Sequence, residues 1–194
     1  MKNDAKLIVM GGSWGGIQAS IAILKALPPD YSIPVVLVLH RLRNADGDLQ
    51  AIFEKKVALQ VQEVEEKASI TPGHVYLAPA NYHVLLEKDQ TFSLDVSDLE
   101  NYSRPSIDVT FTSAADVCGK DVIGILLSGA SKDGSSGLKY IFDKRGTVMV
   151  QNPQEAEVGT MPQSAIDIIP ECTILGLDGI KDFLLSLHDR RTTY

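Results

Sequence analysis

The sequence contains few cysteines and few histidines, and this scarcity excludes several classes of protein. Its two cysteines, Cys118 and Cys172, are too few for the disulfide framework of a small secreted domain. We therefore expect reduced thiols and a cytoplasmic protein. The four histidines show no HExxH or HxH spacing, and no CxxC pair is present. The sequence thus predicts neither a structural disulfide nor a bound metal.

Long apolar runs and an excess of positive charge are also missing. No run approaches the roughly 20 residues that cross a bilayer, and residues 1–6 show no secretory signal. The 18 basic and 25 acidic residues give a net charge of −7, which argues against nucleic acid and against an anionic membrane surface as partners. With 44% hydrophobic and 22% charged residues, we expect one globular domain over 1–194, with its core over about 5–187.

Apolar runs typical of buried strands alternate along the chain with segments whose apolar residues recur at helical spacing. Residues 34–39, Pro-Val-Val-Leu-Val-Leu, form a continuous run of the kind found in the centre of a parallel sheet. We therefore expect an α/β fold, with a doubly wound, mostly parallel sheet flanked by helices. The predicted strands cover 6–10, 34–39, 122–127 and 146–151, and the predicted helices cover 17–27, 48–59, 135–142, 162–168 and 178–187, with another helix opening at Pro105 and a polar tail over 188–194.

The middle of the chain has a different pattern. Residues 74–78, 82–87 and 91–96 alternate between polar and apolar side chains. Turn-forming residues lie before and between them, at Pro72-Gly73 and at 88–90. This pattern predicts a small antiparallel meander or hairpin appended to the parallel sheet.

A glycine-rich segment, Gly11–Gly16, joins the first predicted strand to the first predicted helix. Ser13 stands where a dinucleotide-binding G-x-G-x-x-G needs its second glycine, and no Lys-[Ser/Thr] pair follows, so nucleotide binding is disfavoured. The segment matches G-x-S-x-G, a sharp turn that exposes a serine hydroxyl beside helix N–H groups able to hold an oxyanion. Alone, this pattern fits a glycine-rich turn with a capping Ser13 equally well.

His40 and Asp133 also follow predicted strands. Ligands gather at the carboxyl ends of parallel strands, so both side chains are expected near Ser13. An imidazole can accept the serine proton, and a carboxylate can orient the imidazole. Two alternatives stay open: His40 as a surface or capping histidine, and Asp133 as the N-cap of the next helix.

Several short segments, in order along residues 6–187, match the pattern of one family. They are Met10–Gly16 against G-A-S-T-G-G, Val38–His40 at the end of the second strand, Thr71–Pro79 against P-G-x-x-Y-x-A-P, Arg104–Asp108 against R-P-S-x-D, Leu127–Gly134 against L-T-G-M-G-x-D-G, and Gly159–Pro162 against G-M-P with one extra residue. On these segments the chain resembles the catalytic domain of the chemotaxis protein-glutamate methylesterases, the CheB type.

The resemblance implies a serine esterase that removes methyl groups from γ-glutamyl methyl esters on chemoreceptor helices; some members deamidate receptor glutamines. It implies no cofactor, and a methyl-accepting chemoreceptor or a similar helical protein as partner. It makes the protein a hydrolase of cytoplasmic signal transduction, with no nucleic-acid partner and no membrane insertion. The implied site residues are Ser13 as nucleophile, His40 as general base and Asp133 as orienting acid, with Gly12, Trp14 and Gly15 in the oxyanion loop.

The sequence departs from the family pattern beside these residues. Trp14 replaces a threonine, Ala130 and Ser131 replace a methionine and a glycine, and Leu39 replaces a glutamine. Two alternatives therefore stay open: a serine hydrolase of the same fold with another substrate, and a non-catalytic module that binds a signalling partner. For substrate contacts we name Arg104, whose alternative is a surface salt bridge, together with Ala130 and Met161.

Members of this family usually carry an N-terminal receiver domain. The first predicted strand begins close to Met1, so we expect no receiver domain in this chain. The sequence leaves open a free-standing esterase and a piece of a longer protein. A receiver or a methyltransferase domain is then expected as a separate partner.

Overall fold

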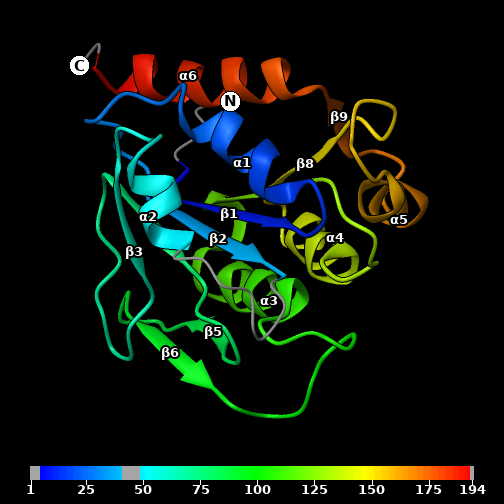
Figure 1. Ribbon diagram of the computed structural model, residues 1–194, viewed down its shortest axis with the longest axis horizontal. Coiled ribbons are helices and arrows are strands. Elements are labelled where there is room, and N and C mark those ends of the chain that lie inside the picture. The colour runs from blue at the N-terminus through cyan, green and yellow to red at the C-terminus, as the bar shows by residue number, and fades with distance from the viewer. Residues whose placement is uncertain (1–4, 41–48, 193–194) are drawn as a thin grey trace.

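A seven-stranded sheet forms the centre of the computed structural model, which describes residues 5–40 and 49–192 (Figure 1). The strand order is β3-β4-β2-β1-β7-β8-β9, and every neighbouring pair is parallel. The strands are β1 (Leu7–Gly12), β2 (Val35–Leu39), β3 (Gln60–Glu63), β4 (His74–Leu77), β7 (Val122–Leu126), β8 (Thr147–Gln151) and β9 (Thr173–Leu175). The expected parallel α/β sheet is confirmed.

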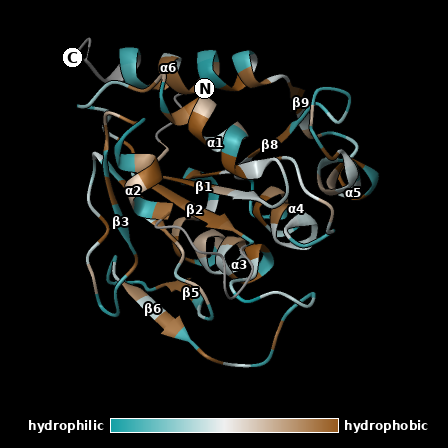
Figure 2. Ribbon diagram, viewed as in Figure 1, coloured by the Kyte–Doolittle hydropathy of each residue, from teal (hydrophilic) through white to brown (hydrophobic). Residues whose placement is uncertain are grey.

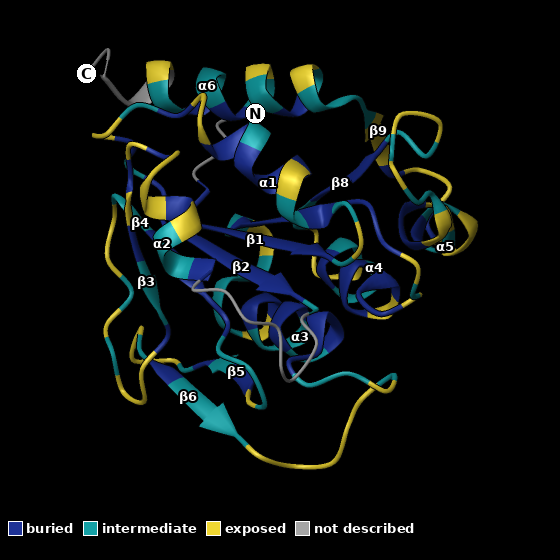
Figure 3. Cartoon of the chain, viewed as in Figure 1, coloured by how far each residue is buried: buried dark blue, intermediate teal, exposed yellow. Residues whose placement is uncertain are grey.

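Helices cover both faces of the sheet. On β1, Ile8 and Met10 point into the core under α1 and α6, whereas Leu7 and Val9 point into the core under α3 and α4. Both faces of the central strands are therefore buried under helices, which explains why these strands are continuous apolar runs (Figures 2 and 3). The helices are α1 (Gly16–Leu24), α2 (Leu49–Glu54), α3 (Ile107–Cys118), α4 (Ser135–Asp143), α5 (Thr160–Ile168) and α6 (Leu177–Thr192), with a 3₁₀ turn over Gly119–Asp121.

The antiparallel appendage is a single hairpin of β5 (His83–Leu86) and β6 (Phe92–Asp95). It packs on α3, where Thr110 Oγ1 donates to the Val84 carbonyl at 2.8 Å. The expected hairpin is confirmed, but the segment 74–78 does not belong to it. Residues 74–77 form β4, which pairs in parallel with β2 and β3, and Val75, Tyr76 and Leu77 are all buried, as in a strand covered on both faces.

Neither edge strand was predicted from the sequence. β3 and β9 carry polar or exposed side chains at most positions, so neither shows an apolar run. The helix expected to open at Pro105 begins two residues later, because Ser106 is extended and precedes its first turn.

The polar tail expected over 188–194 was also wrong for most of its length. α6 continues to Thr192, and the His188 ring stacks on Tyr31 at a centroid distance of 5.7 Å. None of the helices within the described residues is both long enough and apolar enough to cross a membrane.

Candidate active site

The ends of three adjacent strands, β2, β1 and β7, bring the predicted triad residues to one edge of the sheet. Ser13 follows β1, and its N–H donates to the Ser128 carbonyl at 2.9 Å. His40 follows β2, and its N–H donates to the Gly12 carbonyl at 3.1 Å. The expectation that Ser13 and His40 end neighbouring strands is confirmed. These backbone bonds fix the positions from which both side chains leave the sheet.

His40 and Asp133 are in direct contact. Nε2 of His40 lies 2.7 Å from Oδ2 of Asp133, and the Asp133 side chain is fully buried. A carboxylate is an acceptor only, so Nε2 carries the proton and donates it. Nδ1 is then the imidazole nitrogen that carries the lone pair, which makes it the nitrogen able to accept a proton.

Asp133 is not the N-cap of the helix that follows it. Gly134 precedes α4 with a left-handed φ of 93°, and no side chain caps that helix. Asp133 instead accepts N–H groups at the start of α3, from Ile107 at 2.7 Å and Asp108 at 3.1 Å, and the Ser106 hydroxyl at 2.8 Å. The alternative that Asp133 caps the helix after it is therefore wrong. The N–H group that Asp133 accepts from Ile107 belongs to α3, 26 residues earlier in the chain.

These hydrogen bonds keep Asp133 ionised despite its burial. Burial alone would raise the pKa of the carboxyl, but the donors from His40, the Ile107 N–H and Ser106 outweigh it. The pKa of Asp133 consequently lies below its ordinary value. A fixed negative charge thus faces His40, where it can stabilise the imidazolium that forms when His40 takes a proton.

The turn that carries Ser13 is tight and leaves the Ser13 hydroxyl without a hydrogen bond to another described residue. Within the described part of the chain, Ser13 Oγ makes no hydrogen bond, including none to His40. Gly15 adopts a left-handed φ of 78°, and α1 begins at Gly16. The N–H groups of Trp14 and Gly15 donate to no other described residue, so they are available to an anion beside Ser13.

A turn that was not predicted from the sequence reaches the site from the side. Asn101 and Tyr102 both have positive φ, 50° and 62°, between the paired residues Glu100 and Ser103. The Ser103 hydroxyl lies 3.4 Å from His40 Nδ1. The only local sign of this turn in the sequence was the residue type at Asn101, because asparagine adopts positive φ more often than most residues other than glycine.

Asn101 connects two buried carboxylates. Its Nδ2 donates to Asp108 Oδ2 at 2.8 Å and lies 3.3 Å from Asp133 Oδ1. Asp108 also accepts the Gly137 N–H at 2.6 Å. Burial, reinforced by the charge of Asp133, raises the pKa of Asp108 to about 6. The amide of Asn101 therefore separates a carboxylate that stays charged from one that protonates readily.

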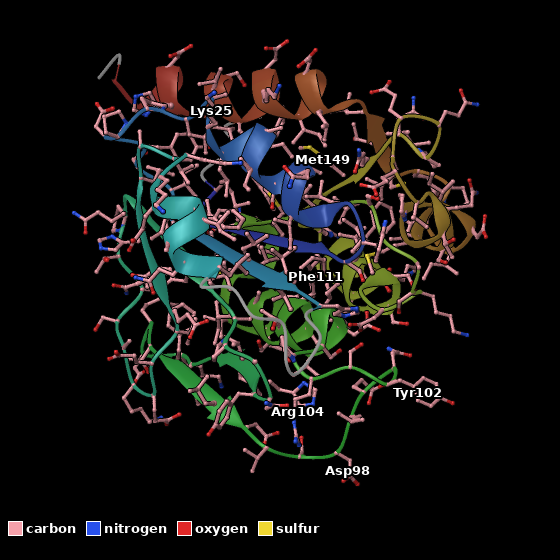
Figure 4. The ribbon with its side chains drawn as sticks, viewed as in Figure 1. Lys25, Asp98, Tyr102, Arg104, Phe111 and Met149 are labelled. Atoms are coloured by element: carbon pink, nitrogen blue, oxygen red, sulfur yellow. The ribbon has the colours of Figure 1, made fainter. Side chains whose placement is uncertain are left out.

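The predicted substrate contacts lie in different surroundings. Arg104 Nη1 donates to the carbonyls of Val96 and Ser97, at 2.7 and 2.6 Å, and so holds the loop that leads from β6 to α3 (Figure 4). Met161 is fully buried, and its N–H donates to the Gly129 carbonyl at 2.9 Å. Ala130 is exposed. A role for these three residues in binding substrate stays a prediction.

The remaining histidines are placed as structural or solvent-facing groups. His83 is buried; its Nδ1 accepts the Ser106 N–H at 3.1 Å and its Nε2 donates to the Asp98 carbonyl at 3.0 Å. This histidine is therefore neutral and ties the hairpin to the start of α3. His74 bonds to the Pro72 carbonyl at 2.9 Å, at the opposite end of its strand from the site.

Nearly the whole chain is similar in sequence and in fold to known proteins. The model of the CheB methylesterase family matches residues 8–184. The catalytic domain of the Thermotoga maritima CheB methylesterase superposes with a TM-score of 0.89 at 31% identity, covering 94% of this chain and 98% of that one.

Relatives of two lengths are found. A Leptospira interrogans protein, provisionally named protein-glutamate methylesterase/protein-glutamine glutaminase, is 44% identical, with 93% of each chain covered. The Carboxydothermus hydrogenoformans protein-glutamate methylesterase/protein-glutamine glutaminase 1 is 35% identical, and the match covers 93% of this chain and 55% of that protein. On this evidence the chain belongs to the CheB methylesterase family.

Proposed function

We propose that the protein hydrolyses γ-glutamyl methyl esters, using Ser13 as nucleophile, His40 as general base and Asp133 as the acid that orients His40. The observation that carries the role of the triad is the 2.7 Å bond between His40 and a buried, ionised Asp133, one strand away from a free serine hydroxyl. Membership of the CheB methylesterase family supports the reaction class.

The reaction needs two acyl-transfer steps. Nδ1 of His40 removes the Ser13 proton while Oγ forms a bond to the ester carbonyl carbon, which gives a tetrahedral oxyanion. The imidazolium returns the proton to the leaving methoxide, so methanol departs and a glutamyl ester of Ser13 remains. Water then attacks with His40 again as base, releasing the γ-carboxylate and restoring the serine. Asp133 stays ionised throughout.

The oxyanion can be held by backbone N–H groups at the nucleophile turn. Trp14 and Gly15 offer unpaired N–H groups just before α1, whose amino end carries a partial positive charge. Gly12 contributes differently: its backbone pairs with β2, and an added Cβ would lie 3.0 Å from Gly16 Cα. The absence of a side chain at Gly12 therefore allows the turn to close.

For the substrate we propose a methylated glutamate on a chemoreceptor or a similar helical protein. The CheB family acts on chemoreceptor methylglutamate. The same chemistry with ammonia as the leaving group deamidates glutamine, and relatives named for both activities support this second reaction. We place the protein in the cytoplasm, where the free thiols of Cys118 and Cys172 persist, and a separate receiver or methyltransferase domain is its proposed regulatory partner.

A fluorophosphonate probe read by intact mass tests the role of Ser13. We expect one adduct on the wild type, none on Ser13→Ala and slower labelling of His40→Ala. Ser103→Ala is the matched control, because the Ser103 hydroxyl lies 3.4 Å from His40 Nδ1 and is a second hydroxyl beside the proposed base; it should keep the adduct. Methanol release from methylated receptor helices then tests the substrate. A wild type without adduct or methanol would favour the non-catalytic binding module instead.

A further inference from the structure

Trp14 presents a large aromatic side chain to solvent directly beside the nucleophile. It is the only tryptophan of the chain and is 68% exposed. The proposed reacting group is a small methyl ester, and the N–H that Trp14 offers to the oxyanion belongs to its backbone. The proposed reaction therefore does not need the indole side chain. Exposed tryptophans are enriched where proteins bind other proteins, because their rings bury much area at little entropic cost.

The indole is held in place rather than free to move. Nε1 donates to Glu157 Oε1 at 2.7 Å. The backbone of Trp14 is fixed as well, since the Ser128 hydroxyl donates to its carbonyl at 2.7 Å and accepts the Val158 N–H at 2.9 Å. A Cβ on Gly15 would lie 2.7 Å from Glu157 Cβ, so the two segments are in close contact. Glu157, in the loop after β8, thus holds the side chain of Trp14, whereas Ser128, which follows β7, holds its main chain.

The strand order places the contact between Trp14 and Glu157 on the opposite side of Ser13 from His40, the proposed base. His40 follows β2 and Glu157 follows β8, on the two sides of the β1–β7 pair that ends in Ser13 and Ser128. The indole N–H is already used by Glu157. The part of Trp14 that a substrate can contact is therefore its apolar ring, which suits an aliphatic side chain or stem and offers no hydrogen bond.

We propose that Trp14 determines specificity by packing its ring against an aliphatic side chain of the protein substrate, next to the methylated glutamate. Glu157 is the positioning residue, because its hydrogen bond fixes the indole ring before the substrate binds. This inference rests on the proposed function, because it concerns the protein part of the substrate of the Ser13 site. A ring fixed before binding loses little conformational entropy on contact, which favours affinity.

The kinetic test compares a methylated receptor helix with p-nitrophenyl acetate. For Trp14→Ala we expect the ratio of kcat/KM for the helix to that for the small ester to fall about tenfold, through a higher KM, as for the loss of one aromatic contact. Glu157→Ala should lower the ratio by about threefold, on the scale of one lost hydrogen bond. Glu157→Gln keeps an acceptor and should restore the ratio.

The matched control is Ile174→Ala, which removes another exposed apolar side chain, 46% accessible, on the far edge strand β9. It should leave the ratio and both rates unchanged. Equal losses on the two substrates, or no loss with Trp14→Ala, would overturn the role of the ring. Equal defects in Glu157→Ala and Glu157→Gln would overturn the positioning role of Glu157 and assign its effect to charge.

A binding measurement separates this inference from the proposed reaction. Because Trp14 is the only tryptophan, the fluorescence of Ser13→Ala reports on it directly, without turnover. Adding the methylated helix should shift the emission to shorter wavelength as the ring is buried. A wild type that releases no methanol while Ser13→Ala shows this shift would reject the esterase and keep the contact. An active wild type without the shift would reject the contact alone.

Discussion

The imidazole of His40 and the carboxylate of Asp133, 93 residues apart in the sequence, meet at 2.7 Å between Nε2 and Oδ2. The same carboxylate accepts the first N–H groups of α3. Asp133 therefore does two things at once: it orients the proposed base, and it neutralises the amino end of a helix whose Phe111 lies in the core. Activity and stability are consequently coupled through one side chain.

Replacing Ser13 should separate activity from stability. Ser13→Ala removes the proposed nucleophile, and we expect kcat for methanol release to fall by about 10⁴-fold or more. The hydroxyl makes no hydrogen bond with another described residue, so the urea midpoint should stay close to that of the wild type. Steady-state kinetics and urea denaturation on the same preparation measure both. If Ser13→Ala kept its activity with an unchanged urea midpoint, another residue would have to be the nucleophile.

Asp133→Asn should lower both quantities. An amide presents N–H groups where the carboxylate accepts donors from His40, Ile107 and Ser106, so kcat should fall by about 10²- to 10⁴-fold and the free energy of unfolding by about 1–3 kcal/mol. Because the pKa of Asp133 is lowered in the folded protein, its ionised carboxylate stabilises the fold at pH values above the ordinary pKa. This stabilisation is lost as the pH falls through the pKa of the folded state.

Ser106→Ala serves as the comparison for Asp133→Asn. It removes one donor to the same carboxylate but leaves the charge and the His40 bond in place. Its effect on unfolding should be smaller, and its loss of kcat much smaller, than that of Asp133→Asn. Thermal melts and methanol release measure the pair. Similar kcat losses in both variants would mean that Asp133 acts only through the fold.

Gly129→Ala should displace Ser13, the proposed nucleophile, without altering a reactive group. An added Cβ would lie 2.9 Å from Ser13 Cβ and 2.7 Å from Met161 Cε, and buried Met161 has little room to retreat. A misplaced Oγ should lower kcat by about 10²-fold. Gly73→Ala is the matched control: its Cβ meets nothing within 4 Å, but φ is +79°, so the change strains the backbone away from the site. Comparable activity losses in the two variants would argue for instability as the common cause.

The sequence predicted the parts of the site that depend on strand ends. Ser13 and His40 follow apolar runs, and a parallel sheet must bring such ends to one edge. The contacts of Asp133 with α3 and the approach of Asn101 to Asp133 were not predictable, because they depend on how a long loop folds back on the sheet. The edge strands β3 and β9 failed for another reason: exposed edges need no apolar pattern.

Asp108 should make the protein less stable as the pH rises from about 4 to about 6. Burial and the neighbouring Asp133 charge raise its folded pKa to about 6, so in this range the folded state binds more protons than the unfolded state. Stability must then fall with increasing pH, opposite to the effect of Asp133. Asp108→Asn cannot ionise, yet keeps an oxygen for the Gly137 N–H. Urea denaturation at pH 4, 5, 6 and 7 should give a flatter pH dependence for the variant. Asp182→Asn, which removes an exposed carboxylate on α6, should follow the wild type, and identical slopes for all three proteins would exclude Asp108 as the cause.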